Sequence, residues 1–336
     1  MIKPLFNISF FFLLAFNIQI SKAEIQVVTS IKPIHSLASL VLDGVAKPQL
    51  IVDGNNSPHN FSLKPSHAKM LQKADVIFWV NKDLESFLVK PLKNISKNAK
   101  KIELINSNGI KKLKFREKNI FENHHDHGKK KHDHHDHGKK KHDHHDHGKK
   151  KHDHHDHGKK KHDHHDHAHG EFDPHIWLDP VNAKVIVKEM AKQLILLDKE
   201  NEKRYRKNLE KAFNRLDELG ADIKGTINKE ARYVVFHDAY QYFENRFNIK
   251  TLGALTVNTE VLPGAEQLKK IRKVIKHQKA KCIFSEPQFN PKIINAIAKD
   301  TNIKTGILDP LGANLKDNKD LYFKLMKNLS SSIKGC

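Results

Sequence analysis

The stretch QVVTSIKPIHSLASLVL at residues 26–42 contains the structural unit that the rest of the chain repeats. Residues 26–31 have the apolar and β-branched composition of a buried strand, and Pro33 stands where a helix begins. The apolar residues that follow recur at helical spacing and predict one buried helix face: Ile34, Leu37, Ala38, Val41 and Leu42. A strand followed directly by an amphipathic helix is typical of the βα units of a parallel sheet.

The same alternation continues through the rest of the chain on both sides of a histidine-rich tract. The expected strands are residues 49–52, 76–80, 102–105, 232–236, 251–255, 281–285 and 305–308. The expected helices are residues 65–73, 84–92, 185–197, 240–247, 267–277, 291–300 and 319–333. This order predicts an α/β protein with two parallel sheets and a ligand cleft at the carboxyl ends of the strands.

One further helix is predicted to connect the two sheets. Its apolar period runs without interruption over residues 201–224, which corresponds to about 35 Å at 1.5 Å per residue. We therefore expect an N-terminal lobe (24–123 with 170–200), a linking helix (201–228) and a C-terminal lobe (229–336). The metal or ligand site would lie in the cleft between the lobes.

The first 23 residues have the features of a cleavable secretory signal. Lys3 precedes an apolar run at 8–16, and small residues stand at the −3 and −1 positions before Glu24. The apolar run is shorter than the roughly 20 residues that a bilayer requires. No cysteine follows the signal, so no lipid anchor is expected. The mature protein is predicted to be exported and soluble.

The chain contains two cysteines, Cys282 and Cys336. In an oxidising compartment an even pair favours one disulfide, which would fix the last residue to a predicted strand. Such a bond would contribute at most about 4 kcal/mol by chain-entropy arithmetic. Two unrelated thiols are the alternative.

Residues 124–169 form a tract of 20 His, 12 Lys and 9 Asp, built on the ten-residue unit KKKHDHHDHG. The unit has no apolar residue to bury, so we predict a disordered loop rather than a repeat domain. Neutral imidazoles in flexible chain make many weak metal sites, which would raise the metal concentration near the cleft. An expanded repeat without a role is the alternative. Candidate auxiliary ligands are His124, His125, His127, His132, His134, His135 and His137.

The formal net charge is +21, with 60 Lys and Arg against 39 Asp and Glu. Outside the signal and the tract, the positive charge is spread as single lysines along predicted helices. An Arg-rich arm and an RNA-binding aromatic motif are both lacking, so we do not expect nucleic acid as a partner. A solvated basic surface explains the charge.

Six histidines lie outside the tract, and three of them stand in turns or directly after predicted strands. These are His59, His175 and His237, and Asp309 follows the strand at 305–308 in the same way. Three imidazoles and one carboxylate converging on one cleft ion would suit tetrahedral Zn²⁺. Of the other three histidines, we expect His67 and His277 to be solvated on lysine-rich helices. His35 is ambiguous.

Four motifs together resemble the ZnuA-type zinc-binding receptors, the periplasmic solute-binding proteins of bacterial zinc ABC transporters. These motifs are PHNFSLKPS at 58–66, DPHIWLDP at 173–180, FHDAY at 236–240 and FSEPQF at 284–289. The resemblance covers residues 24–336. It implies two α/β lobes bridged by a rigid helix, a disulfide between Cys282 and Cys336, and His59, His175 and His237 as zinc ligands.

The resemblance also implies a location and a partner. It places the protein in the periplasm, as a monomer that captures Zn²⁺ for a membrane permease. Some relatives carry an acidic residue where this chain has Pro58, so the fourth ligand falls to Asp309 or to water. Glu286 is expected to be structural. Manganese-binding relatives have a carboxylate at the position of His237, and a third imidazole favours zinc.

Two other functions are compatible with part of the pattern. Three histidines with an open coordination position would also suit a zinc hydrolase, but the sequence has no HExxH motif and no evident general base. A metal-storage protein would use only the tract, with the lobes as a scaffold. We therefore expect a zinc receptor that is not an enzyme.

Overall fold

A computed structural model describes residues 24–116, 170–257, 259 and 263–336. The expected signal at 1–23 and the histidine-rich loop at 124–169 lie outside the described residues. The described chain forms two lobes, each built on a parallel four-stranded sheet.

The first sheet has the strand order β2-β1-β3-β4. Its strands are β1 (Val27–Ile31), β2 (Gln49–Val52), β3 (Val76–Trp79) and β4 (Lys100–Glu103). Every residue of β1 is buried, as expected for an inner strand of a parallel sheet that is covered on both faces. The connecting helices are α1 (Lys32–Val41), α2 (Pro65–Lys73) and α3 (Ser86–Asn94).

The second sheet repeats this topology in the order β6-β5-β7-β8. Its strands are β5 (Tyr233–His237), β6 (Gly253–Thr256), β7 (Cys282–Ser285) and β8 (Lys304–Ile307). The helices that follow the first three strands are α6 (Gln241–Phe247), α7 (Ala265–His277) and α8 (Lys292–Thr301). The prediction of two parallel α/β lobes is confirmed.

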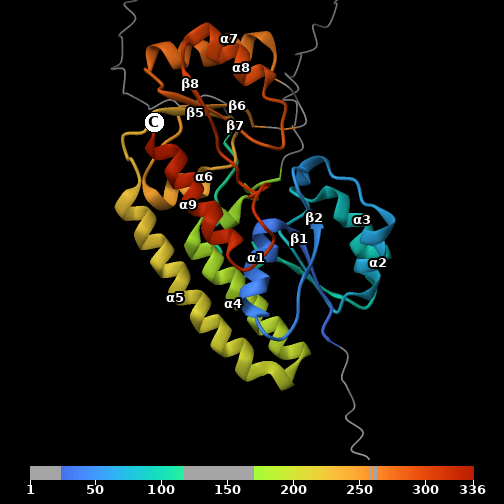
Figure 1. The fold of residues 1–336 in the computed structure, drawn as a ribbon. Coiled ribbons are helices and arrows are strands. Elements are labelled where there is room, and N and C mark those ends of the chain that lie inside the picture. Colours follow the sequence, from blue (N-terminus) through green and yellow to red (C-terminus); the bar gives the residue numbers. More distant parts are fainter. Residues whose placement is uncertain (1–23, 117–169, 258, 260–262) are drawn as a thin grey trace, which may run out of the picture.

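Two long antiparallel helices run along one side of the molecule (Figure 1). They are α4 (Pro180–Leu197) and α5 (Glu202–Thr226), joined by the short 3₁₀ helix η4 (Lys199–Asn201). Helix α5 ends next to the second lobe, as the apolar period predicts. The closing helix α9 (Leu321–Lys334) returns from the second lobe and packs against α1 and α5. The apolar face of α9 therefore belongs to the core that α1, α4 and α5 share.

The predicted disulfide is present between Cys282 in β7 and Cys336 at the end of α9. Their Cα atoms lie 5.6 Å apart across 54 positions of sequence. The bond therefore holds the terminus of α9 to the second sheet while the rest of the helix packs on the first lobe. The alternative of two free thiols is excluded for these two residues.

Most element boundaries differ from the sequence expectation by one or two residues, and two differences have identifiable reasons. Helix α4 begins five residues earlier than predicted, because Pro180 fits the first helical position and Asp179 accepts a hydrogen bond from the Val181 N–H at 2.8 Å. Strand β4 lies two residues earlier than predicted. The apolar residues at 104 and 105 belong to the 3₁₀ helix η2 (Leu104–Asn106), and the lysines at 100 and 101 are exposed on an edge strand.

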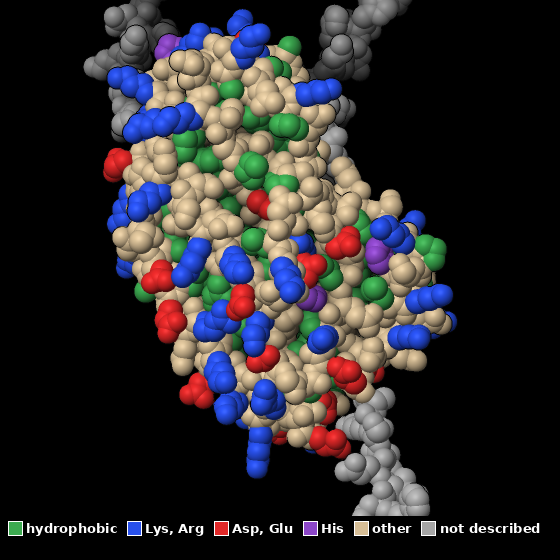
Figure 2. Space-filling view, viewed as in Figure 1, with side chains coloured by type: hydrophobic (Ala, Val, Ile, Leu, Met, Phe, Trp, Pro, Cys, Tyr) green, Lys and Arg blue, Asp and Glu red, His purple; other side chains and the backbone are tan. Residues whose placement is uncertain are grey.

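Charged side chains of both signs share the lower part of the visible surface, around α4 and α5 (Figure 2). Ion pairs link neighbouring helices, as Lys184 of α4 pairs with Asp217 of α5 and Lys327 of α9 pairs with Asp222 of α5. None of the helices in the described ranges combines the length and apolar character needed to cross a membrane.

Candidate metal centre

Three histidines are brought together from three separate segments of the chain. His59 lies in the 3₁₀ helix η1 (Pro58–Asn60), which follows β2 and is capped by the Ser57 hydroxyl. His175 precedes the 3₁₀ helix η3 (Ile176–Leu178), and His237 is the last residue of β5. Two strand ends and the turn before η3 therefore bring the three rings to one region.

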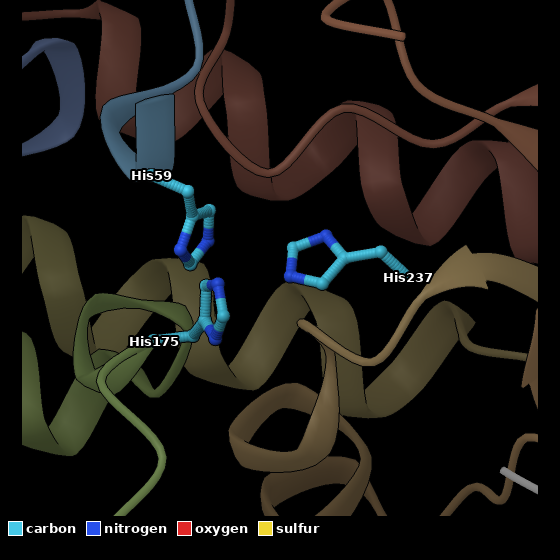
Figure 3. Close-up of side chains that lie close together, drawn as sticks. All are labelled: His59, His175 and His237. Atoms are coloured by element: carbon cyan, nitrogen blue, oxygen red, sulfur yellow. The ribbon is translucent and has the colours of Figure 1, made fainter. Parts of the chain in front are cut away.

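The three imidazoles face a common point (Figure 3). One ligand nitrogen from each ring lies within 4.8 Å of the others. The ring centres of His175 and His237 are 5.0 Å apart, and those of His59 lie 5.8 and 5.4 Å from them. Nitrogens bound to one tetrahedral zinc at about 2.0–2.1 Å stand about 3.3 Å apart. The three nitrogens are therefore close enough for small side-chain adjustments to let them share one ion.

Carboxylates fix the orientation of two of the rings. Asp173 Oδ1 lies 2.7 Å from Nδ1 of His175, and both oxygens of Glu286 lie 3.2 Å from Nδ1 of His237. Each contact assigns the ring proton to Nδ1 and leaves Nε2 with its lone pair for a metal. Asp173 was missed by the sequence analysis, although its place two residues before His175 was visible. Glu286 contacts His237 on the Nδ1 side of the ring and lies outside the group of three converging nitrogens.

The Glu286 carboxylate also changes the pKa of His237. Burial alone would lower the pKa of this imidazole, but the charge and hydrogen bond of Glu286, helped by Asp238 and Asp173, outweigh burial and raise it. A metal must therefore displace a proton from His237 at pH values where an ordinary histidine is already neutral.

The walls of the site are mostly apolar, with Leu84, Trp177, Phe289 and Pro310 among the lining residues. The Trp177 ring centre lies 5.3 Å from that of His175, and its Nε1–H donates to the Pro310 carbonyl at 2.8 Å. The cavity measures about 10 Å³, about the space that one water molecule needs. Its size fits an ion better than an organic substrate.

The structure does not bring Asp309 into this group of nitrogens. Oδ1 accepts hydrogen bonds from the backbone N–H groups of residues 311 and 312, each at 3.0 Å, and from Gln288 Nε2 at 3.1 Å. Oδ2 accepts from the N–H of Ala313 at 2.6 Å. The carboxylate therefore shapes the turn after β8, and its oxygens are committed to that turn. A sequence pattern cannot distinguish such a turn carboxylate from a ligand.

The remaining histidines have other roles. His67 is 7% exposed and its Nδ1 accepts the Lys64 N–H at 3.1 Å, so the expectation that it is solvated was wrong. The His67 ring thereby caps the N-terminus of α2. His35 is buried and its Nε2 lies 3.0 Å from the Pro48 carbonyl, away from the three ligands. His277 is exposed, as expected.

Three neutral imidazoles with one further coordination position form a donor set suited to Zn²⁺. Nitrogen donors also bind other late first-row divalent ions, whereas Mg²⁺, Ca²⁺ and Mn²⁺ favour oxygen. The arrangement can therefore capture a zinc ion from water and hold it in a largely apolar pocket.

Comparisons with known proteins show the family to which the chain belongs. Residues 27–336 match the family model described as "Zinc-uptake complex component A periplasmic". The chain is 49% identical over 312 residues to the high-affinity zinc uptake system protein ZnuA of Brucella abortus (strain 2308), covering 92% of this chain and 91% of that one. It is 36% identical over 324 residues to the ZnuA protein of Yersinia pestis, covering 94% and 92%.

A crystal structure of a ZnuA deletion mutant with zinc bound has the same fold, with a TM-score of 0.69 and 22% identity over 93% of this chain and 97% of that one. The family match and the identity to curated relatives both extend over nearly all of the chain. The chain therefore belongs to the ZnuA family of periplasmic zinc-uptake components.

Proposed function

We propose that this protein is a high-affinity zinc receptor of the periplasm, which binds one Zn²⁺ through His59, His175 and His237 and delivers it to the membrane permease of a zinc ABC transporter. The observation that carries the proposal is the convergence of three imidazole nitrogens within 4.8 Å. Two of these rings are oriented by carboxylates in a pocket of ionic size. The names of the relatives support zinc as the cargo.

Zinc is the substrate in this proposal, and the protein needs to bind it tightly and release it intact. Water is the fourth ligand that we propose, because the oxygens of Asp309 are committed to the turn after β8. Ligands from both lobes give the permease a means of release: a small separation of the lobes would pull His237 from His175 and reduce the coordination of the ion.

We also propose that the histidine-rich segment is an auxiliary loop that feeds this site. Its position along the chain supports this role, since the described residues on its two sides, Lys114 and Phe172, pair in an antiparallel bridge. Phe172 lies three residues before His175. A loop tethered there keeps its imidazoles at high effective concentration near the cleft.

Zinc titration of a variant lacking residues 124–169, against a competing chelator, tests the receptor proposal. We expect one tightly bound ion per chain. Substitution of His59, His175 or His237 by alanine in that variant should abolish the tight binding, because two nitrogens leave the ion undercoordinated. A storage protein would keep no tight site after the deletion, and this result would refute the receptor proposal.

Delivery to the permease needs a separate test. The zinc-loaded protein should stimulate ATP hydrolysis and zinc uptake by its ABC transporter in reconstituted vesicles, and the metal-free protein should support no uptake. Deletion of residues 124–169 should leave transport at saturating zinc unchanged and slow it when zinc is scarce.

A further inference from the structure

Arg116 connects the chain of the first lobe to the residues that follow the ligand strand β5. Its Nη1 donates to Asp238 Oδ1 at 2.8 Å and its Nη2 donates to Glu244 Oε2 at 2.5 Å. Asp238 directly follows His237, and Glu244 lies in α6. The side chains of Asp238 and Glu244 are 6% and 4% exposed. One guanidinium therefore holds both the turn after β5 and the helix after it.

Asp173 makes a second connection between the lobes, beside the first. Its Oδ1 accepts hydrogen bonds from the backbone N–H of His175 at 2.9 Å and pairs with the His175 ring. Its Oδ2 accepts from Gln241 Nε2 at 3.1 Å, and its carbonyl accepts from the Tyr242 hydroxyl at 2.8 Å. The carboxylate that orients one ligand ring is thus bonded directly to α6.

Arg116 and Asp173 belong to one small unit, which consists of two segments joined by an isolated antiparallel bridge. Lys114 pairs with Phe172, and the Asp173 N–H donates to the Leu113 carbonyl at 2.9 Å. Gln241 Nε2 also donates to the Lys114 carbonyl at 3.1 Å. A displacement of this unit relative to α6 would therefore move His175 relative to His237.

We propose that Arg116 is a positioning residue for metal binding, which holds His237 of the second lobe at the correct separation from His175 of the first. This inference rests on the proposed function as a zinc receptor. The required precision is high, because a shift of about 1 Å separates bonded nitrogens from nitrogens that miss the ion. Two buried carboxylates also repel one another unless a cation lies between them. Without Arg116, the turn that carries His237 should move or gain water.

A purely structural role for Arg116 is the competing explanation, and the chain offers a matched control for it. Arg246 of α6 pairs with Asp179, the cap of α4, through Nε–Oδ1 and Nη2–Oδ2 distances of 2.6 and 2.7 Å. As in the Arg116 pairs, the carboxylate side chain is buried: Asp179 is 3% exposed. The pair likewise joins α6 to the first lobe. Neither Arg246 nor Asp179 adjoins a ligand in sequence.

Zinc release can be followed at the cleft in the full chain, even with the histidine-rich tract present. Trp177 contacts the His175 ring, so its fluorescence reports occupancy of the three-histidine site. Replacement of the only other tryptophan in a Trp79→Phe parent makes this signal specific. If the variant lacking residues 124–169 binds no zinc tightly in the chelator titration described above, the proposed function fails, and this outcome is distinct from any result on Arg116.

The experiment measures zinc release into excess chelator and urea unfolding of the metal-free protein for Arg116→Gln, Arg116→Lys and Arg246→Gln in this parent. We expect Arg116→Gln to release zinc about 10–100-fold faster, the range for residues that orient ligands. Arg116→Lys should release zinc at an intermediate rate, since one ammonium group cannot bind two carboxylates in the fixed geometry of a planar guanidinium. Arg246→Gln should change release less than about threefold despite a similar loss of stability.

Equal acceleration by Arg116→Gln and Arg246→Gln, or none by Arg116→Gln, would overturn the proposal. If Arg116→Gln does not fold, the triple variant Arg116→Met, Asp238→Asn, Glu244→Gln removes the buried charges together with the connection. It should fold and still release zinc rapidly. Release at the rate of the parent from this variant would equally overturn the proposal.

Discussion

Glu286→Gln tests whether a carboxylate that pairs with a proposed ligand histidine controls zinc affinity. Both Glu286 oxygens lie 3.2 Å from Nδ1 of His237, and both side chains are almost fully buried. A glutamine preserves the shape but can donate to Nδ1 instead of accepting from it. That exchange would place the ring proton on Nε2, the nitrogen needed for zinc.

The expected loss at pH 7.5 is about 10–100-fold in zinc affinity, or roughly 1.4–2.7 kcal/mol. The loss should shrink as the pH falls. Glu286 raises the pKa of His237 against the opposing effect of burial, so protons compete with zinc in the wild type from a higher pH. Removing the carboxylate lowers this pKa, and protons then begin to compete with zinc only at a lower pH.

The assay is a chelator competition between pH 5.5 and 8, read by Trp177 fluorescence in the Trp79→Phe parent. The control is Glu85→Gln, which alters a buried carboxyl that accepts hydrogen bonds from the backbone N–H groups of residues 80 and 81. Its affinity at pH 7.5 should equal that of the parent. A loss that stays constant or grows toward low pH in Glu286→Gln would refute the reasoning.

Three further predictions follow from single features of the structure. His59→Ala should lower the affinity of the cleft for zinc at least 100-fold by the Trp177 signal, whereas His277→Ala, on the exposed end of α7, should leave it unchanged. Burial raises the pKa of Glu85 from 4.5 to about 7; the native state therefore holds a proton that the unfolded state loses. The free energy of unfolding should fall by up to about 3 kcal/mol from pH 4.5 to above pH 7, and urea titrations of Glu85→Gln should show a flatter dependence. Replacing Cys282 and Cys336 by serine should lower the free energy of unfolding by at most about 4 kcal/mol in urea titrations, without changing zinc affinity.

Much of the fold could be predicted from the sequence, because local signals and global topology agree. The alternation of buried strands and amphipathic helices is repeated on both sides of the tract, and a parallel sheet follows from it directly. Both ends of β2 and both ends of α2 were predicted to the residue. The packing of α9 on α1 and α5 was not foreseen, since the apolar face of a helix does not identify its partner.

The convergence of the three imidazoles could be predicted because His59 follows β2 and His237 ends β5, where the carboxyl ends of parallel strands meet, and His175 lies in a turn flanked by Asp and Pro. The carboxylates near them could not be assigned in the same way. Asp309 satisfies backbone groups of its own turn, Asp173 orients a ligand, and Glu286 lies 49 positions from the histidine that it contacts. All three look alike in sequence, and only the three-dimensional neighbours of each oxygen separate these roles.

The positions of these carboxylates also bear on how one receptor can bind zinc tightly and still release it. Each ligand ring that a carboxylate orients is paired with a residue from its own lobe: His175 with Asp173, and His237 with Glu286. Separation of the lobes would therefore leave each of these rings correctly oriented while breaking the coordination of the ion. Rebinding then requires only that the lobes return, because the rings need no reorientation. If Arg116 sets the closed separation and the proposed permease takes the ion by separating the lobes, the Arg116–Asp238 pair is one of the contacts that this separation must break. Zinc release from the Arg116→Gln variant should then be faster without the permease and should gain less from its presence than release from the parent.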